Sequence, residues 1–425
     1  MEHVYEEQLR PRFRPEFAIS READWIDTAF VALVLGSLLF YLMLAQLAVL
    51  LMLSATAGII LLRWDRLPQA FATSWPLFSL PALCMASAAW SDVPATSLYY
   101  ATLYTATALA GILIGSALNR SSYIDGSFIA FAIFAIGCLL FGRTVGHNNG
   151  GVAFAGLVGS KNTMGDMAAI GLMVTLAFVA FKLHQRRPVA AALALPFAPL
   201  IAAQLFLSKA TGALIAALAG SALLIIWIVS RRLEIQVRSA LLASSVILLV
   251  VGIATMQFWV EPVFDFVVEA SGKDAGLTGR LDLWAYGESL ISQRPIAGLG
   301  YAAFWLENNL DAERLKLMMG VSNTAVFNFH STPMELIVHL GYLGFALACL
   351  VALFASARLI YRSALAPEYS AIFACALLAF WSVKTPFEVI AFSPVHFSTV
   401  TVYAVLAMGL RRDRSQAIVK RYRST

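Results

Sequence analysis

Residues 213–230 read ALIAALAGSALLIIWIVS, a run in which no side chain is charged. A helix of about 20 mostly apolar residues crosses about 30 Å of hydrocarbon, because each residue adds about 1.5 Å. Runs of this kind recur along the chain, which is 60% hydrophobic and only 13% charged. Soluble domains carry about 25% charged residues, so the composition predicts that lipid surrounds most of this protein.

The apolar runs predict an all-α, polytopic membrane protein with about twelve transmembrane helices and a long helical periplasmic loop. No internal repeat divides the helices, which we therefore treat as one membrane domain. All four cysteines fall inside apolar runs without CxxC spacing, which indicates buried thiols rather than disulfides or a metal site. The predicted spans lie near 26–43, 45–62, 69–90, 98–118, 124–142, 163–181, 189–207, 213–230, 239–257, 333–355, 371–389 and 396–410.

The basic residues predict the orientation. If both termini are cytoplasmic, most of the 30 lysines and arginines fall in cytoplasmic segments, as the positive-inside rule requires. The chain then divides into a cytoplasmic segment 1–25, helices 26–257, a periplasmic loop 258–332, helices 333–410 and a cytoplasmic tail 411–425. The basic residues left outside need a separate reason; they are Arg143, Lys161, Lys209, Lys273, Arg280, Arg294, Arg314, Lys316 and Lys384.

The periplasmic loop carries helical patterns of its own. We predict one amphipathic helix over 260–271, a second capped by Thr278, and a third in DAERLKLMM, 311–319, that ends at Gly320. Helices of this kind lie in the membrane interface or fold back over the bundle as a lid. The second helix is expected to present one apolar stripe of Leu281, Trp284 and Ile291.

The stretch FNFHSTPMELIVHLGYLG, 327–344, is the sharpest local feature. Thr332, Pro333 and Glu335 fit the N-cap, N1 and N3 positions of a helix, and Glu335 suits a cap better than a catalyst. His330 then lies just outside a helix N-terminus, where the positive end of the dipole attracts anions and favours a neutral imidazole. The alternative reading of His330 is an ordinary histidine in a surface loop.

Several further polar residues fall near the outer ends of the predicted spans. The guanidinium of Arg280 suits phosphate oxygens, although a solvent-exposed arginine paired with Asp282 or another acidic neighbour would explain it equally well. Lys161 and Lys209 either snorkel to the interface or form, together with Asn162, a cationic mouth for a phosphorylated lipid headgroup.

Two other features have structural alternatives that are at least as simple. Lys384 and Glu388, spaced i, i+4, are predicted to pair with each other. Arg143 lies in the glycine-rich GRTVGHNNGG, which either approaches a sugar or only turns the chain. The sequence contains no Walker A motif, HExxH, zinc-ligand spacing or GxSxG elbow, so we predict no metal and no cofactor.

Four motifs, taken in their order, resemble the O-antigen ligase and polysaccharide polymerase superfamily, and the third is most similar to exopolysaccharide production polymerases. They are GLVGSKNTMG (156–165), LSKATGALIAAL (207–218), TGRLDLWAYGESLISQRPIAGLGYAAFW (278–305) and FHSTPMELIVHLGYLG (329–344). The resemblance implies a membrane glycosyltransferase at the periplasmic face of the bacterial inner membrane. The reaction that the resemblance implies joins repeat units carried on undecaprenyl pyrophosphate into exopolysaccharide, without a metal or nucleotide sugar.

The resemblance also implies roles for individual residues. Arg280 corresponds to the loop arginine that holds pyrophosphate, and His330 to the histidine that assists deprotonation of the acceptor. Lys161 and Asn162 match a KN pair of the family. Lys209 stands where many members have arginine, which keeps the charge but loses bidentate geometry. The implied partners are the lipid-linked glycan, an acceptor glycan, the bilayer and, as a hypothesis, export and chain-length machinery; no nucleic acid is expected.

Three alternatives remain at this point. A ligase of the same chemistry would transfer finished glycan to lipid A–core or to a protein, and donor motifs do not distinguish it from a polymerase. A transporter tends to place charges at the bilayer midplane on broken helices, whereas the unusual charges here cluster at the outer boundary. A structural scaffold would tolerate loss of Arg280 and His330.

Overall fold

The computed structural model describes residues 24–147, 151–234, 236–238, 240–241, 244, 278–322 and 326–411. The predicted span 239–257 and the predicted helix 260–271 lie almost wholly outside these residues. The elements of the first half are α1 (Trp25–Leu39), α2 (Tyr41–Leu44), α3 (Gln46–Leu62), the 3-10 turn η1 (Trp64–Arg66), α4 (Leu67–Ser74), η2 (Trp75–Phe78), α5 (Ser79–Ala86), η3 (Ser87–Ala89), α6 (Pro94–Ser116) and α7 (Arg120–Phe141).

The remaining elements begin with a short antiparallel hairpin of β1 and β2, which the all-α prediction did not include. β1 lies within the glycine-rich segment 142–151, which was expected to be a loop, and β2 begins at its last residue. The elements are β1 (Arg143–His147), β2 (Gly151–Gly156), α8 (Lys161–His184), α9 (Pro188–Ala194), α10 (Phe197–Leu207), α11 (Thr211–Ser230), α14 (Thr278–Gln293), α15 (Leu310–Met318), α16 (Thr332–Leu365), α17 (Tyr369–Lys384) and α18 (Phe397–Leu410).

Within the described ranges, six helices are long and apolar enough to cross a membrane, or seven if the bent pair Gln46–Leu62 and Trp64–Ala89 counts as one span. The helices α1, α17 and α18 are apolar but shorter. The protein is therefore a multi-pass helical membrane protein, whereas the count of about twelve spans stays a prediction. The predicted third span, 69–90, is broken into α4, η2, α5 and η3, and Pro76 lies at that break.

Charged side chains gather at one end of the bundle, which we call the basic end. Asp27 is buried and binds both Arg63 and Arg66, at 2.7 Å and 3.2 Å. Other arginines there cap carbonyls of neighbouring helices, as Arg411 does for Leu118 O at 2.5 Å. The basic residues in the short loops that loop counting assigned to the cytoplasm thus meet at a single end.

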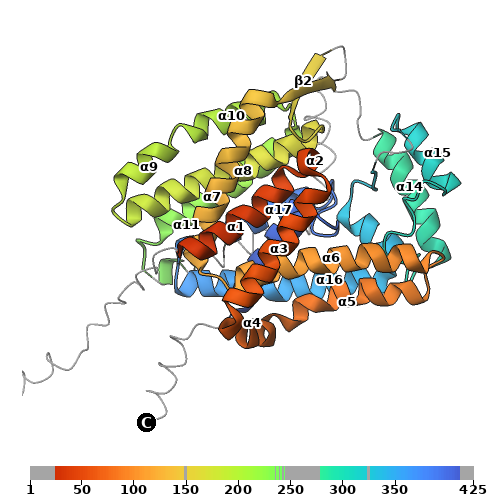
Figure 1. The fold of residues 1–425 in the computed structure, drawn as a ribbon, viewed down its shortest axis with the longest axis horizontal. Helices are drawn as coiled ribbons and strands as arrows, with labels where there is room; N and C mark the ends of the chain where they lie inside the picture. The colour runs from red at the N-terminus through yellow and green to blue at the C-terminus, as the bar shows by residue number, and fades with distance from the viewer. Residues whose placement is uncertain are drawn as a thin grey trace, which may run out of the picture.

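The opposite end, which we call the loop end, carries the starts of α8, α11 and α16 and the end of α17. Figure 1 shows α14 and α15 together at the edge of the molecule, beyond the ends of α6 and α16. α15 ends before Gly320, as predicted, whereas Thr278 is the first residue of α14 rather than its cap. Leu281 is exposed and does not belong to the buried stripe. The apolar cluster that holds these helices consists of Leu283, Leu290, Phe304, Ala312, Leu315, Phe329 and Val338.

The segment after α14 fastens the loop to a break in α16. Gly341 has φ +65°, which interrupts the hydrogen bonds of that helix. The amides of Leu299 and Gly300 donate to the carbonyls of Val338 and His339, both at 2.9 Å, and the amide of Tyr342 donates to Pro295 O at 2.8 Å. The motif RPIAGLGY therefore supplies the backbone partners that the kink removes.

Candidate functional site

Glu388 is the centre of a polar cluster at the loop end. Its Oε1 lies 3.5 Å from Arg280 Nη2 and accepts a hydrogen bond from Asn162 Nδ2 at 3.4 Å. Its Oε2 lies 3.4 Å from Nδ1 of His330. Three candidates from distant parts of the sequence thus meet on one carboxylate, whose side chain is only 17% exposed.

The start of α16 is fixed beside Glu388 by a hydroxyl. Thr332 Oγ1 donates to the carbonyl of Glu388 at 2.7 Å and accepts from the amide of Ile390 at 2.8 Å. The N-cap of α16 is Ser331, whose side chain accepts from the amide of Met334, so the prediction of Thr332 as N-cap was wrong by one residue. The shift leaves the threonine hydroxyl available to join α16 to the loop after α17.

His330 is held in an uncommon backbone conformation just before α16. Its φ is +49°, and its amide donates to Asn328 Oδ1 at 2.8 Å, which stabilises the turn. The ring packs edge-on against Phe327. Because Nδ1 faces the Glu388 carboxylate, the proton of a neutral imidazole belongs on Nδ1, and Nε2 remains an acceptor. The side chain is 26% exposed, so substrate has access to it.

Glu335 supports the turn that carries His330. Its Oε2 accepts a hydrogen bond from the amide of Phe329 at 2.9 Å, in the manner of a capping residue that reaches back across the helix start. Trp284 of α14 donates its Nε1 to the carbonyl of the same Phe329 at 2.8 Å. The turn before His330 is therefore fixed from both α16 and α14, and α14 in turn places Arg280 over Glu388.

The other predicted cations lie at different distances from the cluster. Lys161 is the first residue of α8 and precedes Asn162, which contacts Glu388 directly. Lys209 is exposed in the turn between α10 and α11, with φ +52°, and no described contact joins its side chain to Glu388. Arg143 is exposed at the start of β1, and no described contact brings it to the cluster.

Lys384 and Glu388 do not pair as predicted. The Nζ of Lys384 lies 2.9 Å from Oδ1 of Asp166 on α8, and both side chains are buried. The i, i+4 rule applies within a helix, but α17 ends at Lys384, so Glu388 follows a different path and turns toward His330. Reasoning from sequence gave Glu388 only a structural pairing and did not consider Asp166, whereas the structure places Glu388 at the centre of the cluster and Asp166 against Lys384.

The charge state of Glu388 follows from its neighbours. Burial opposes ionisation, but the hydrogen bond with His330 and the charges of Lys384, His330 and Arg280 outweigh it and hold the pKa of Glu388 below its ordinary value. Glu388 is therefore a carboxylate at neutral pH. Within the described ranges, no three His, Cys, Asp or Glu side chains lie close enough to form a metal site.

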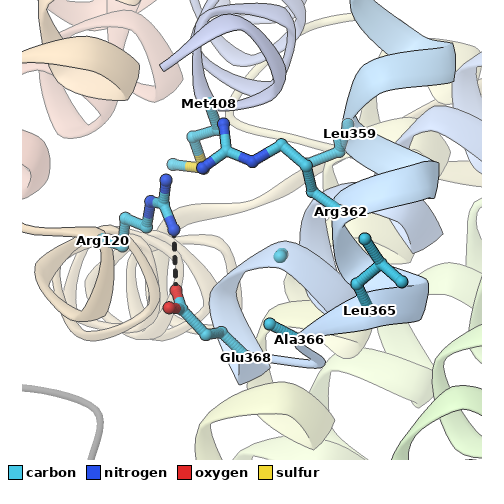
Figure 2. A pocket seen from close by; sticks show the side chains of 8 residues that line it. Arg120, Leu359, Arg362, Leu365, Ala366, Glu368 and Met408 are labelled. Carbon is cyan, nitrogen blue, oxygen red and sulfur yellow. Dashed lines mark hydrogen bonds and ion pairs between the residues drawn. The ribbon is translucent and has the colours of Figure 1, made fainter. Parts of the chain in front are cut away.

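A pocket at the basic end lies away from this cluster. Figure 2 shows the guanidinium groups of Arg120 and Arg362 in it, with Met408 beside them. Arg120 Nη1 binds Glu368 Oε2 at 3.0 Å, which joins the start of α7 to the start of α17. Arg362 donates to carbonyls at the end of α18. These contacts close the helix ends of the bundle, and none of the residues predicted for the site lines this pocket.

Fold and cluster together define a multi-pass helical membrane protein with a charged, partly exposed site at one end of its bundle. The sequence model of the O-antigen ligase family matches residues 196–349 of the chain. The predicted resemblance to that family is thereby confirmed. The matched range contains Lys209, Arg280 and His330, whereas Glu388 lies beyond it.

One curated relative extends the similarity over most of the chain. The chain is 26% identical over 356 residues to the exopolysaccharide production protein ExoQ of Rhizobium meliloti (strain 1021). The alignment covers 81% of this chain and 79% of ExoQ.

Proposed function

We propose that this protein polymerises oligosaccharide repeat units, carried on undecaprenyl pyrophosphate, into exopolysaccharide at the periplasmic face of the inner membrane. The observation that carries the proposal is the meeting of Arg280, His330 and Asn162 on Glu388 at the loop end. The family match and the similarity to ExoQ support glycosyl transfer as the proposed reaction class.

In this proposal the donor diphosphate binds among fixed positive charges. Arg280 offers two parallel N–H groups to phosphate oxygens, and Lys161 and Asn162 stand at the first turn of α8. The starts of α8, α11 and α16 all lie at this end, so their dipoles add positive potential. Lys209 joins the site as a mobile cation at the rim. Charge that develops on the leaving diphosphate is stabilised by these groups without a metal ion.

His330 is the proposed general base. The acceptor hydroxyl oxygen forms a bond to the anomeric carbon of the donor, and the bond from that carbon to the diphosphate oxygen breaks, with its electron pair leaving on the diphosphate. The hydroxyl proton passes to Nε2 of His330. Glu388 holds the proton on Nδ1 and stabilises the imidazolium that forms, the role that a carboxylate plays beside a catalytic histidine in general.

The proposed orientation places the basic end in the cytoplasm and the loop end in the periplasm, with both termini cytoplasmic. Its support is the concentration of arginines at one end, which agrees with the positive-inside rule. A donor with a polyprenyl anchor would then enter from the bilayer and present its diphosphate at the loop end. Export and chain-length machinery would act on the same side.

The nearest alternative is a ligase that transfers lipid-linked glycan to lipid A–core or to a protein, and the name of the matched family favours it. Gel profiles of lipid-linked glycans from a deletion strain distinguish the two. A polymerase predicts accumulated single repeat units. A ligase predicts lipid-linked polymer of normal length that is missing from the cell surface.

A transporter is the alternative of another class. Its signature would be flux of glycan or anion into proteoliposomes that contain no lipid-linked donor. The proposed enzyme predicts no such flux, and in the presence of donor it predicts longer glycan together with free undecaprenyl pyrophosphate. Flux without product would overturn the enzymatic proposal.

A further inference from the structure

We propose that Lys384 and Asp166 form a positioning pair that sets the charge and direction of the Glu388 carboxylate and, through it, the competence of His330. This inference rests on the proposed function, because it assigns the pair a role in the same site. No described contact joins either residue to His330, and in this proposal both act through Glu388.

The geometry connects the pair to the cluster twice. Asn162 and Asp166 are one turn apart on α8, and both reach toward the end of α17. Asn162 donates to Glu388, while Asp166 binds Lys384. Lys384 is the last residue of α17, and the amide of Glu388 donates to its carbonyl at 2.9 Å. Two residues on the same face of α8 therefore contact the end of α17: Asp166 binds Lys384, and Asn162 binds Glu388.

The charges of Lys384 and Asp166 act strongly on neighbouring groups because both side chains are buried. The side chains of Lys384 and Asp166 are 6% and 10% exposed, so water screens them little. A buried ion pair costs desolvation that apolar packing between α8 and α17 would avoid. The two charges act on Glu388 in opposite senses, because Lys384 favours its ionised form and the negative charge of Asp166 opposes it.

Every element around Glu388 contributes to its electrostatic environment. Lys384 and Arg280 favour its ionised form, His330 does so when protonated, and Asp166 opposes it while also neutralising part of the Lys384 charge. The groups that face Glu388 are Arg280 from α14, Asn162 and, behind Lys384, Asp166 from α8, His330 from the turn before α16, Lys384 from α17 and His396 from the start of α18.

The balance explains why both members are needed. Without Asp166, the full charge of Lys384 competes with His330 for the Glu388 carboxylate and draws it away from Nδ1. Without Lys384, Glu388 loses a positive charge that favours its ionised form, and its pKa rises. With both present, Glu388 stays ionised and remains directed at the imidazole.

Opposite pH shifts test the proposal. The acid limb of the kcat/KM profile should move up by about one pH unit in Lys384→Met and move down in Asp166→Asn, since the two changes alter the potential at Glu388 in opposite senses. Lys384→Arg should restore the native profile. A purely structural pair predicts equal losses at every pH, and shifts in the same direction or no shifts would overturn the proposal.

A charge swap covers the case in which a single variant fails to fold. Asp166→Lys with Lys384→Asp keeps an ion pair between α8 and α17 but places the negative member beside Glu388. We expect near-native amounts in the membrane, an activity loss of at least tenfold and an acid limb moved upward. A swapped protein with native activity and pH profile would refute the positioning role.

A readout without turnover separates this inference from the proposed function. Infrared titration of the purified protein follows the carboxyl band that disappears in Glu388→Gln. Its midpoint should move up in Lys384→Met and down in Asp166→Asn even if no glycan is ever transferred. Unchanged titration midpoints would refute this inference alone. Shifted midpoints in a protein without transferase activity would refute only the proposed function.

Discussion

Replacing Glu388 by glutamine tests the centre of the proposed site, because it removes the charge and keeps the shape. Two unit charges 3.4 Å apart, the separation of Glu388 Oε2 and His330 Nδ1, attract by about 5 kcal/mol at an effective dielectric constant of about 20. Both side chains are partly exposed, and screening reduces this to about 2 to 3 kcal/mol. We therefore expect kcat to fall by about a hundredfold.

Purified protein in proteoliposomes, supplied with lipid-linked repeat units, provides the assay. The KM for the donor should stay the same or fall, since Arg280 loses its intramolecular partner and remains available to the diphosphate. Glu307→Gln, which changes an exposed glutamate between α14 and α15, is the matched control and should behave as the native protein does. A kcat for Glu388→Gln within threefold of native would refute the role of the carboxylate.

The pH dependence of the same pair has a definite sign. The folded-state pKa of Glu388 lies below its ordinary value, so its charge is fully present above that ordinary value and is lost only as the pH falls through the lowered one. The infrared carboxyl band that is absent in Glu388→Gln should therefore appear only when the pH falls below that ordinary value. A band that already appears near neutral pH would contradict the assignment.

Three further predictions concern the cations, the base and the kink. Arg280→Ala and His330→Ala should abolish polymer while membrane levels, measured by immunoblot, stay intact; normal polymer in both would place the site elsewhere. Lys209→Arg should retain activity and Lys209→Ala should lose most of it in the same assay. Gly341→Ala should destabilise the protein in thermal unfolding by about 3 kcal/mol or more, since φ is +65° and a methyl would meet Ile296, whereas Gly320→Ala, with φ +66° and open space, should cost only the strain.

The helical membrane architecture could be predicted from the sequence because lipid imposes a simple length rule. Apolar runs such as 213–230 became single helices, and α11 covers Thr211–Ser230. The same rule did not predict that 69–90 would break into four pieces. Pro76 leaves backbone groups without their helical hydrogen bonds, and whether such a break is stable depends on the neighbouring helices. Loop counting found which basic residues would share an end.

The candidate site was predicted in part. Features that are local in sequence were recognised, whereas contacts between distant parts of the chain were not. Arg280, His330 and Asn162 were singled out because each has an unusual charge or polarity at the outer boundary, and the structure brings all three to Glu388. The pairing of Lys384 with Glu388 was wrong because the rule used is local, whereas Lys384 finds its partner on α8, more than two hundred residues away in sequence.

Which residue caps α16 could not be predicted from the sequence, and the choice affects the contact between Thr332 and Glu388. Either Ser331 or Thr332 satisfies capping chemistry, and only packing decides between them. With Ser331 as the cap, Thr332 is released to bind the carbonyl of Glu388, and that bond holds the turn of His330, the proposed general base, beside the Glu388 carboxylate. A threonine that capped the helix at position 332 would use its hydroxyl for the cap and would not bind Glu388. The spacing between His330 and Glu388 therefore depends on this one hydroxyl, which Thr332→Ser keeps and Thr332→Val removes.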